Sequence, residues 1–99
     1  MNIHPQIEHP QSIGIVNKRV LDGVSAAYSV ALDLAAKGFI VKGIHSSSDQ
    51  PRIELHANNL CRVLDSGVKK QGRDRKGPYQ VRAACIDGCE VNWTVRRNP

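Results

Sequence analysis

The stretch that decides the fold runs KRVLDGVSAAYSVALDLAAKGFIVKGIH, from Lys18 to His45. Its apolar residues first recur at the spacing of one helical face, at Val20, Val24, Ala27, Ala31 and Leu34. Other apolar residues widen this stripe, namely Leu21, Tyr28, Leu32 and Ala35. A stripe this broad is typical of a helix that lies across a sheet, so we expect one long helix over residues 18–37.

Both ends of the expected helix carry residues that helix ends prefer. Asn17 can cap the start, or Asp22 can if Gly23 delays it. Gly38 supplies the left-handed residue that commonly follows a helix, and Lys37 places a positive charge at the negative end of the helix dipole. These signals support the helix independently of its apolar spacing.

Two strands and a polar connection are expected next. Residues 39–45 form an apolar run, residues 46–50 are polar, and residues 51–57 alternate with a period of two. A loop over 46–50 pairs Val41 with Leu55, Gly43 with Ile53, and His45 with Pro51. The same register sets Lys42 opposite Glu54, where opposite charges stabilise a cross-strand pair. The two features agree on one hairpin.

The middle of the chain is less regular. Residues 58–66 fit either a short helix or a third strand. Residues 67–78 lack periodicity and are rich in glycine and charge, so we expect a flexible loop there. The cations of this basic loop are Lys69, Lys70, Arg73, Arg75 and Lys76, beside the acid Asp74.

A second hairpin is expected from residues 79–86 and 89–97. A two-residue Asp87-Gly88 turn mixes core and solvent faces, whereas a three-residue loop starting at Ile86 keeps them apart. The longer loop pairs Cys85 with Cys89, Ala83 with Val91, and Val81 with Trp93. We expect this register, because a slip of one residue turns every side chain to the other face. The polar face then carries Arg82, Glu90, Asn92, Thr94 and Arg96.

These elements predict an α+β fold in two layers, with one long helix on an antiparallel sheet of about four strands, ordered α-β-β-(short element)-β-β. Residues 13–99 form a single domain, and residues 1–12, with Pro5 and Pro10 among polar neighbours, form a flexible N-terminal arm. One face of the sheet is left open to solvent or to a partner.

Composition narrows the classes of function. The chain has 99 residues, of which 40% are hydrophobic. No run approaches the roughly 18 apolar residues of a membrane span. The N-terminus lacks the basic and apolar regions of a signal peptide, so we expect a cytoplasmic protein without a membrane partner. The formal net charge of +5 favours anionic partners.

The basic loop is the main candidate binding site. With nearby arginines it gives the candidate contacts Lys69, Lys70, Arg73, Arg75, Lys76, Arg82, Arg96 and Arg97. Such cations can bind phosphates, although the alternative is a solvated loop that only keeps the protein soluble. No aromatic residue interleaves the charges, and no recognition-helix pattern is present. We expect a non-enzymatic binding module whose partner is a nucleic acid or an acidic host protein.

The cysteines carry a weaker signal. In the expected register Cys85 and Cys89 face each other, close enough for a disulfide or for two metal ligands. A metal site usually needs a second ligand pair, and only Cys61 and scattered histidines remain. Cysteines on an apolar sheet face are mostly small buried hydrophobes, so we expect neither a metal nor a cofactor.

His45 and His56 support a second hypothesis, because histidine can act as an acid or a base near neutral pH. The helix end and the His-bearing strand, over residues 34–56, resemble the HicA-type toxins that cleave mRNA. Those toxins place their histidine in a Gly-Ser-His turn on an α-β-β-β-α fold, whereas this chain has Gly43 and Ile44 before its histidine. The resemblance implies a small RNase that uses His45 or His56.

The C-terminal hairpin carries another resemblance. The stretch Gly88-Cys89-Glu90-Val91-Asn92-Trp93, preceded by a basic loop and by a helix ending in Lys37-Gly38-Phe39, resembles small uncharacterised proteins encoded by phages and prophages of proteobacteria. The resemblance covers residues 20–96. It implies a phage accessory protein that binds a host factor, such as a defence effector with a charged channel. A third hypothesis is self-association into a homo-oligomer through the open sheet face or a strand edge.

Overall fold

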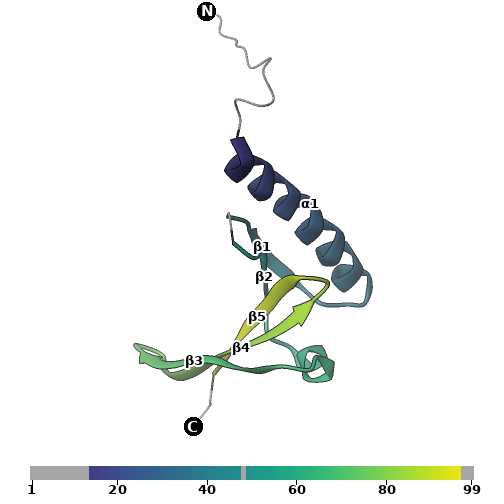
Figure 1. The fold of residues 1–99 in the computed structure, drawn as a ribbon. Coiled ribbons are helices and arrows are strands. Elements are labelled where there is room, and N and C mark those ends of the chain that lie inside the picture. Colours follow the sequence, from purple (N-terminus) through teal and green to yellow (C-terminus); the bar gives the residue numbers. More distant parts are fainter. Residues whose placement is uncertain (1–13, 48, 97–99) are drawn as a thin grey trace, which may run out of the picture.

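The computed structural model describes residues 14–47 and 49–96. One N-terminal helix packs on a five-stranded mixed sheet that is mostly antiparallel, so the predicted α+β class is confirmed (Figure 1). The elements are α1 (Gly14–Ala36), β1 (Val41–His45), β2 (Arg52–Leu55), the 3₁₀ helix η2 (Asn59–Val63), β3 (Gly67–Asp74), β4 (Gly77–Ile86) and β5 (Cys89–Arg96). The arm expected over residues 1–12 and the candidate contact Arg97 lie outside the described residues.

The helix α1 begins before the expected start. Gly14 is its first described residue, so Asn17 and Asp22 both lie inside the helix. The prediction that one of them caps it is therefore wrong, although Asp22 does accept a hydrogen bond from Lys18 Nζ at 2.9 Å. This pair joins residues four positions apart on the exposed surface, a spacing that supports a helix by a few tenths of a kcal/mol.

The end of α1 agrees with the prediction. The helix stops at Ala36, and Gly38 follows with a φ of +99°. This left-handed backbone, which glycine adopts without a steric cost, turns the chain back on the last helical turn. Phe39 then donates its N–H to the carbonyl of Leu34 at 3.0 Å. Phe39 follows the end of α1, and its aromatic side chain is buried in the core beneath the helix.

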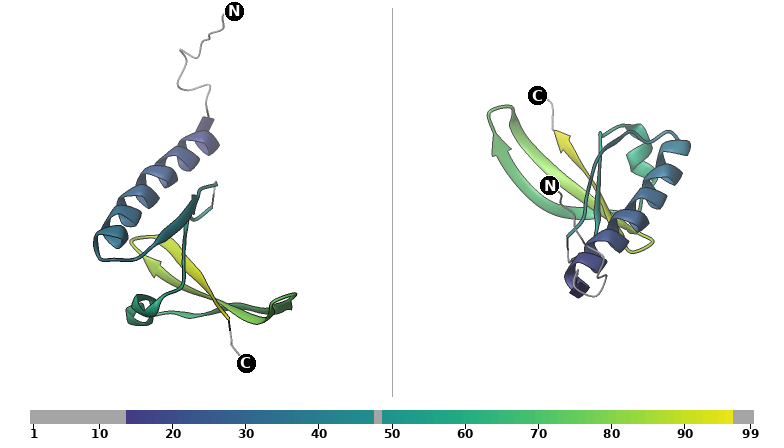
Figure 2. Two further views of the ribbon diagram at one scale, coloured as in Figure 1. Left: turned by 180° about the vertical axis from the view of Figure 1, so that it is seen from behind. Right: turned by 90° about the horizontal axis from the view of Figure 1, so that it is seen from above.

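Only the C-terminal half of α1 packs on the sheet. Its buried residues are Ala27, Val30, Ala31 and Leu34. The wider stripe was expected to face the sheet, but Leu21, Tyr28 and Leu32 are 61%, 58% and 53% exposed. The sheet supports α1 through β1, β2 and β5, while the β3–β4 hairpin bends away from the helix (Figure 2). The part of the sheet that lies beneath α1 is therefore too narrow to cover the whole apolar stripe.

The first hairpin is confirmed, with one change of register. Val41 pairs with Leu55 as expected, but a bulge at Lys42 shifts the pairing beyond it by one residue. The expected pairs of Gly43 with Ile53 and His45 with Pro51 are wrong, and the observed pairs are Gly43 with Glu54 and His45 with Arg52. The Lys42 Nζ still lies 3.8 Å from Glu54 Oε2, so the predicted charge pair is confirmed. Bulges are frequent at sheet edges, where β1 lies.

The segment 58–66, for which helix and strand stayed open, contains the 3₁₀ helix η2. The Asn58 side chain caps η2, because its Oδ1 accepts the N–H of Leu60 at 3.0 Å. Cys61 turns inward from η2 and is buried against the core. This short helix therefore closes one end of the sheet beside α1 (Figure 1).

The prediction of a flexible loop over residues 67–78 is wrong. This segment forms β3, a tight turn and the start of β4. Asp74 Oδ1 accepts the N–H of Lys76 at 2.9 Å, and Gly77 has a φ of +109°. Asp at the first position and Gly at the last are the preferred residues of a type I turn. The apolar alternation that would mark a strand is missing, because β3 has no buried residue on either face.

The second hairpin forms, but it adopts the register of the two-residue Asp87-Gly88 turn, which is not the register that we expected. Asp87 and Gly88 have φ values of +49° and +81° and make a two-residue turn of the type that suits twisted hairpins. Ile86 therefore pairs with Cys89, Ala84 with Val91, and Arg82 with Trp93. The prediction failed because it assigned Val81, Ala83 and Cys85 to the core. The helix side of β4 instead carries Ile86, Ala84 and Arg82.

The strand order is β1-β2-β5-β4-β3, and β2 runs parallel to β5. An antiparallel sheet of about four strands was expected, so both the fifth strand and this parallel pair are corrections. The neighbouring strands β2 and β5 hold the largest fully buried side chains: Ile53, Leu55, Cys89 and Val91. Both strands lie inside the sheet, with no exposed edge, and both contact α1. Among the described residues, no helix is long and apolar enough to cross a membrane.

Candidate functional site

The two faces of the sheet differ in chemistry. We call the side turned away from α1 the open face (Figure 2). Side chains alternate along a strand, so burial of Ile53 and Val91 under α1 places Arg52, Glu54 and Asn92 on the open face. The strands thus bury apolar groups on one side and present polar groups on the other.

The open face carries a surplus of positive charge. Its cations are Lys42, Arg52, Lys69, Lys70, Lys76 and Arg96, and the acids that the strands place there are Glu54, Asp74 and Glu90. Each of these acids already has a cationic partner, at 3.8 Å for Lys42 and Glu54, 2.6 Å for Lys69 and Glu90, and 2.7 Å for Arg96 and Asp74. Arg52, Lys70 and Lys76 therefore add charge that these ion pairs do not neutralise.

Glu90 is the most enclosed acid of the open face. Lys69 projects from the bulge in β3 and donates to Glu90 Oε2 at 2.6 Å, and Asn92 Nδ2 donates to the same oxygen at 2.7 Å. Burial raises the pKa of Glu90, but these two hydrogen bonds and the positive charges of Lys69 and Arg52 outweigh it and leave the pKa below its usual value. Glu90 is therefore ionised and neutralised at pH 7.

A second cluster stiffens the β3–β4 hairpin. Arg96 donates to both oxygens of Asp74, at 2.9 and 2.7 Å, and its guanidinium lies 5.3 Å from the centre of the Tyr79 ring. The hydrogen bond from Arg96, followed by that from the Lys76 backbone, lowers the pKa of Asp74. A Cβ at Gly72 would lie 2.7 Å from Tyr79 Cζ, so only glycine leaves room for the ring. Arg96 thus ties the last strand to the hairpin.

The remaining cations of the hairpin are exposed. Lys70 points to the open face, Arg73 pairs with Pro78 on the other face, and Arg75 and Lys76 form the turn. Within residues 14–47 and 49–96, no side-chain hydrogen bond or ion pair engages these four cations. A hydrogen-bonded hairpin fixes the backbone that carries them, so less backbone entropy is lost when they bind a partner than would be lost from a mobile loop.

Arg82 lies on a different face from the one predicted. It was expected among the polar residues of the sheet, but it pairs with Trp93 on the helix side. Its Nε donates to Ser66 Oγ at 3.0 Å and its Nη2 to the Ser66 carbonyl at 3.1 Å. Arg82 therefore anchors the chain just before β3 and does not belong to the basic surface of the open face.

The two histidines lie at separate places on the open face. His45 borders a depression with Arg52 and Lys69, and His56 borders another with Lys42 and Lys76. His45 pairs with Arg52, which precedes His56 by four residues, or about 13 Å along a strand. An acid and a base that act on one phosphate must both reach it, so this separation does not favour joint action.

The cysteines do not face each other. Cys85 pairs with Glu90 and is exposed on the open face, whereas Cys89 is buried on the helix side. The expectation that Cys85 and Cys89 are small buried hydrophobes is confirmed for Cys89 and wrong for Cys85, and Cys61 is also buried. Burial, followed by the charge of Asp87, raises the pKa of Cys89. Among the described residues, no cluster of three or more His, Cys, Asp or Glu side chains can hold a metal ion.

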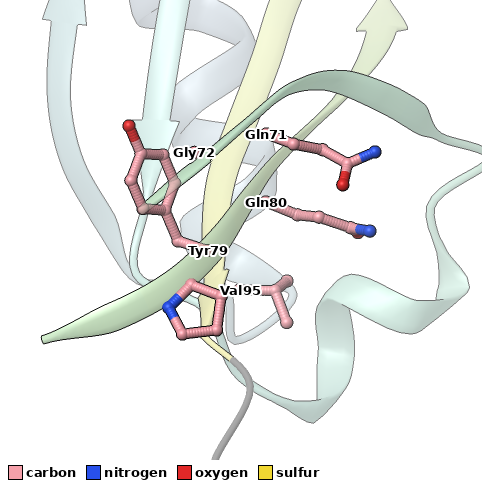
Figure 3. A pocket seen from close by; sticks show the side chains of 6 residues that line it. Gln71, Gly72, Tyr79, Gln80 and Val95 are labelled. Carbon is pink, nitrogen blue, oxygen red and sulfur yellow. The ribbon is translucent and has the colours of Figure 1, made fainter. Parts of the chain in front are cut away.

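A small hollow on the helix side of the hairpin offers a contrast. Figure 3 shows Gln71 and Gln80 side by side near Val95, with the Tyr79 ring turned to the other side. The described side chains that line this hollow are uncharged. A hollow without charge has no means of attracting an anion from a distance, so the open face remains the better candidate site.

Both edges of the sheet carry features that discourage strand pairing. The β1 edge is interrupted by the bulge at Lys42, and the β3 edge carries its own bulge beside Lys69 and Lys70. Bulges and lysines are the usual protection of exposed strand edges. Self-association through an edge stays a prediction that these features do not favour.

The sequence pointed to part of this site. Lys69, Lys70, Lys76 and Arg96 were expected as contacts and lie on the open face. Lys42, a candidate only as the phosphate-holding residue of the RNase hypothesis, and Arg52, which was not a candidate, lie there too. The alternation of residues 51–57 was the signal for Arg52. Comparisons with protein-family models, with curated proteins and with solved structures found no match. The resemblance to phage-encoded proteins stays a prediction.

Proposed function

We propose that this protein binds a nucleic acid with the open face of its sheet and the turn of the β3–β4 hairpin. The observation that carries the proposal is the state of the acids on this face. Glu54, Asp74 and Glu90 are each neutralised by a lysine or arginine, and Lys70 and Lys76 remain exposed beside them. A surface with compensated acids and surplus cations attracts phosphates.

The geometry of the hairpin supports the same conclusion. Arg96 and Asp74 brace the hairpin, and the turn holds Arg75 and Lys76 at its end. On a braced element the backbone that carries the cations does not have to be ordered when they contact phosphates. The proposal retains the predicted binding module and replaces its flexible loop with a structured hairpin.

The test is the salt dependence of binding by a variant that lacks the surplus charge. We expect Lys70→Gln/Lys76→Gln to bind a nucleic acid at least about tenfold more weakly than the natural chain at 0.1 M salt. The slope of log affinity against log salt should fall by about two, because each lost phosphate contact contributes about 0.9. Fluorescence anisotropy with a labelled oligonucleotide measures both quantities.

The matched control is Arg19→Gln/Lys37→Gln. It removes the same charge from two exposed residues outside the open face, Arg19 on α1 and Lys37 directly after its end. Its slope should stay that of the natural chain. Equal loss in both double variants would show attraction by net charge alone and would contradict the proposed site. Binding to an acidic protein, with none to nucleic acid, would overturn the proposal in favour of the other predicted partner.

A further inference from the structure

We infer that the nucleic acid is double-stranded and that one of its backbones lies along a groove in the open face. This inference rests on the proposed function and names its substrate class. The open face holds two depressions, of about 480 Å³ at His45 and Arg52 and about 440 Å³ at His56 and Lys76, and the groove of this proposal is the path from one to the other across β5. Both depressions are bordered by cations from the two hairpins.

The strand β5 forms the floor of this groove. Asn92 contributes to one depression and Thr94 to the other, so the floor is polar and uncharged. One wall comes from the β1–β2 hairpin, through Lys42 and Arg52, and also holds Glu54, whose charge Lys42 offsets at 3.8 Å. The other wall comes from the β3–β4 hairpin, through Lys69 and Lys76. A polar floor between cationic walls matches a phosphate backbone.

The length of the groove matches a short run of phosphates. Its two depressions are bordered by Arg52 and His56, which are four residues apart on one strand. At about 3.3 Å per residue this separation is about 13 Å. One strand of a duplex rises about 3.4 Å per phosphate along the helix axis, and its winding backbone travels farther than this between phosphates, so fewer than four phosphates fit beside the floor.

The aromatic residues argue against a single strand. Proteins that bind single strands stack bases on exposed aromatic rings. Phe39 and Trp93 are buried in the core, Tyr28 lies on α1, and the Tyr79 ring is packed over Gly72 and Arg96. These are all the aromatic residues of the chain. Tyr79 is therefore the one aromatic residue of the described strands on the open face, where it pairs with Arg96, and its ring is occupied by the contacts with Gly72 and Arg96. A duplex also has the higher density of phosphates.

The experiment compares a 20-base-pair DNA duplex, the corresponding RNA duplex and each separate DNA strand by fluorescence anisotropy at 0.1 M salt. We expect at least one duplex to bind tenfold or more tightly than either strand. A single strand that binds as tightly as the better duplex would overturn the inference and leave the proposed function standing. Binding of none of these probes would overturn both.

A second arm tests the path of the backbone. Arg52→Gln/Lys76→Gln removes one cation from each wall, at opposite ends of the groove. We expect the salt slope for the duplex to fall by about two, and Arg19→Gln/Lys37→Gln to leave it unchanged. An unchanged slope in the groove variant, with a native circular dichroism spectrum and normal duplex affinity, would show that the backbone lies elsewhere.

Discussion

The same strands give the sheet two chemically different faces, an apolar one that α1 covers and a polar one that is exposed. On the helix side, Ile53 and Val91 are completely buried beneath α1, and their contribution is to stability. On the open face, their neighbours Glu54 and Asn92 form polar contacts that a folded chain can lose at little cost. The open face was therefore free to accumulate charge, because the fold does not depend on it.

Neighbouring residues of β2 give the largest expected contrast. We predict that Ile53→Ala lowers the free energy of unfolding by about 2–4 kcal/mol, because it leaves a cavity at the centre of the core. Glu54→Gln should change it by less than about 0.5 kcal/mol, because Glu54 is exposed. Urea denaturation measures both. A Glu54→Gln variant as unstable as Ile53→Ala would break the distinction between the faces.

The cysteines distinguish the faces by chemical reactivity. In the native protein we expect a thiol reagent to modify Cys85 at least about a hundredfold faster than Cys61 and Cys89, which react only when the structure opens. Burial also raises the pKa of Cys89 and keeps its thiol protonated. Mass spectrometry of the labelled chain reads out each site. Protection of Cys85 as strong as that of Cys89 would indicate the register expected from the sequence, in which both cysteines face the core.

The glycines of β3 test the packing of the hairpin. We predict that Gly72→Ala destabilises the protein by about 1–2 kcal/mol, because the new Cβ displaces the Tyr79 ring and its contact with Arg96. Gly67→Ala is the matched control, since a Cβ at that position meets no atom within 4 Å. Thermal unfolding compares the two variants. Equal melting temperatures would show that the ring contributes nothing to the hairpin.

The smallest expected effect is the pH dependence from Glu90. The folded pKa of Glu90 lies below its usual value, so its contribution is complete above that value, about 4.3, and is lost as the pH falls below it. We predict that Glu90→Gln is less stable than the natural chain by up to about 1 kcal/mol at pH 6, with the gap shrinking towards pH 3. Urea titrations at both pH values measure the gap. A gap that widens in acid would contradict the assigned ion pair with Lys69.

The predictable part of this fold is the part that is buried on one side. The helix and the β1–β2 hairpin carry apolar periodicity, because the core selects residues at those positions. The β3 strand carries none, because neither of its faces is covered, and only the turn signal of Asp74 and Gly77 marked it. A search for alternating apolar and polar residues therefore does not find strands that are exposed on both faces.

The β4–β5 register failed for a related reason. Matching apolar residues across the hairpin favoured a core that contains Val81 and Ala83, but their strand faces α1 through Ala84 and Ile86 instead. The Asp87-Gly88 turn, with positive φ at both residues, outweighed the apolar match. Turn chemistry was the better guide here, and it also decides which cations reach the open face.

The central claim is that the open face, and not α1, meets the nucleic acid. The most direct test follows backbone amide signals by nuclear magnetic resonance while a 20-base-pair duplex is added. We predict that the largest shifts gather at Arg52–His56, Asn92–Arg96 and the turn at Arg75 and Lys76, with residues 18–32 of α1 unchanged. Shifts confined to α1, or an unchanged spectrum at saturating duplex, would contradict the claim.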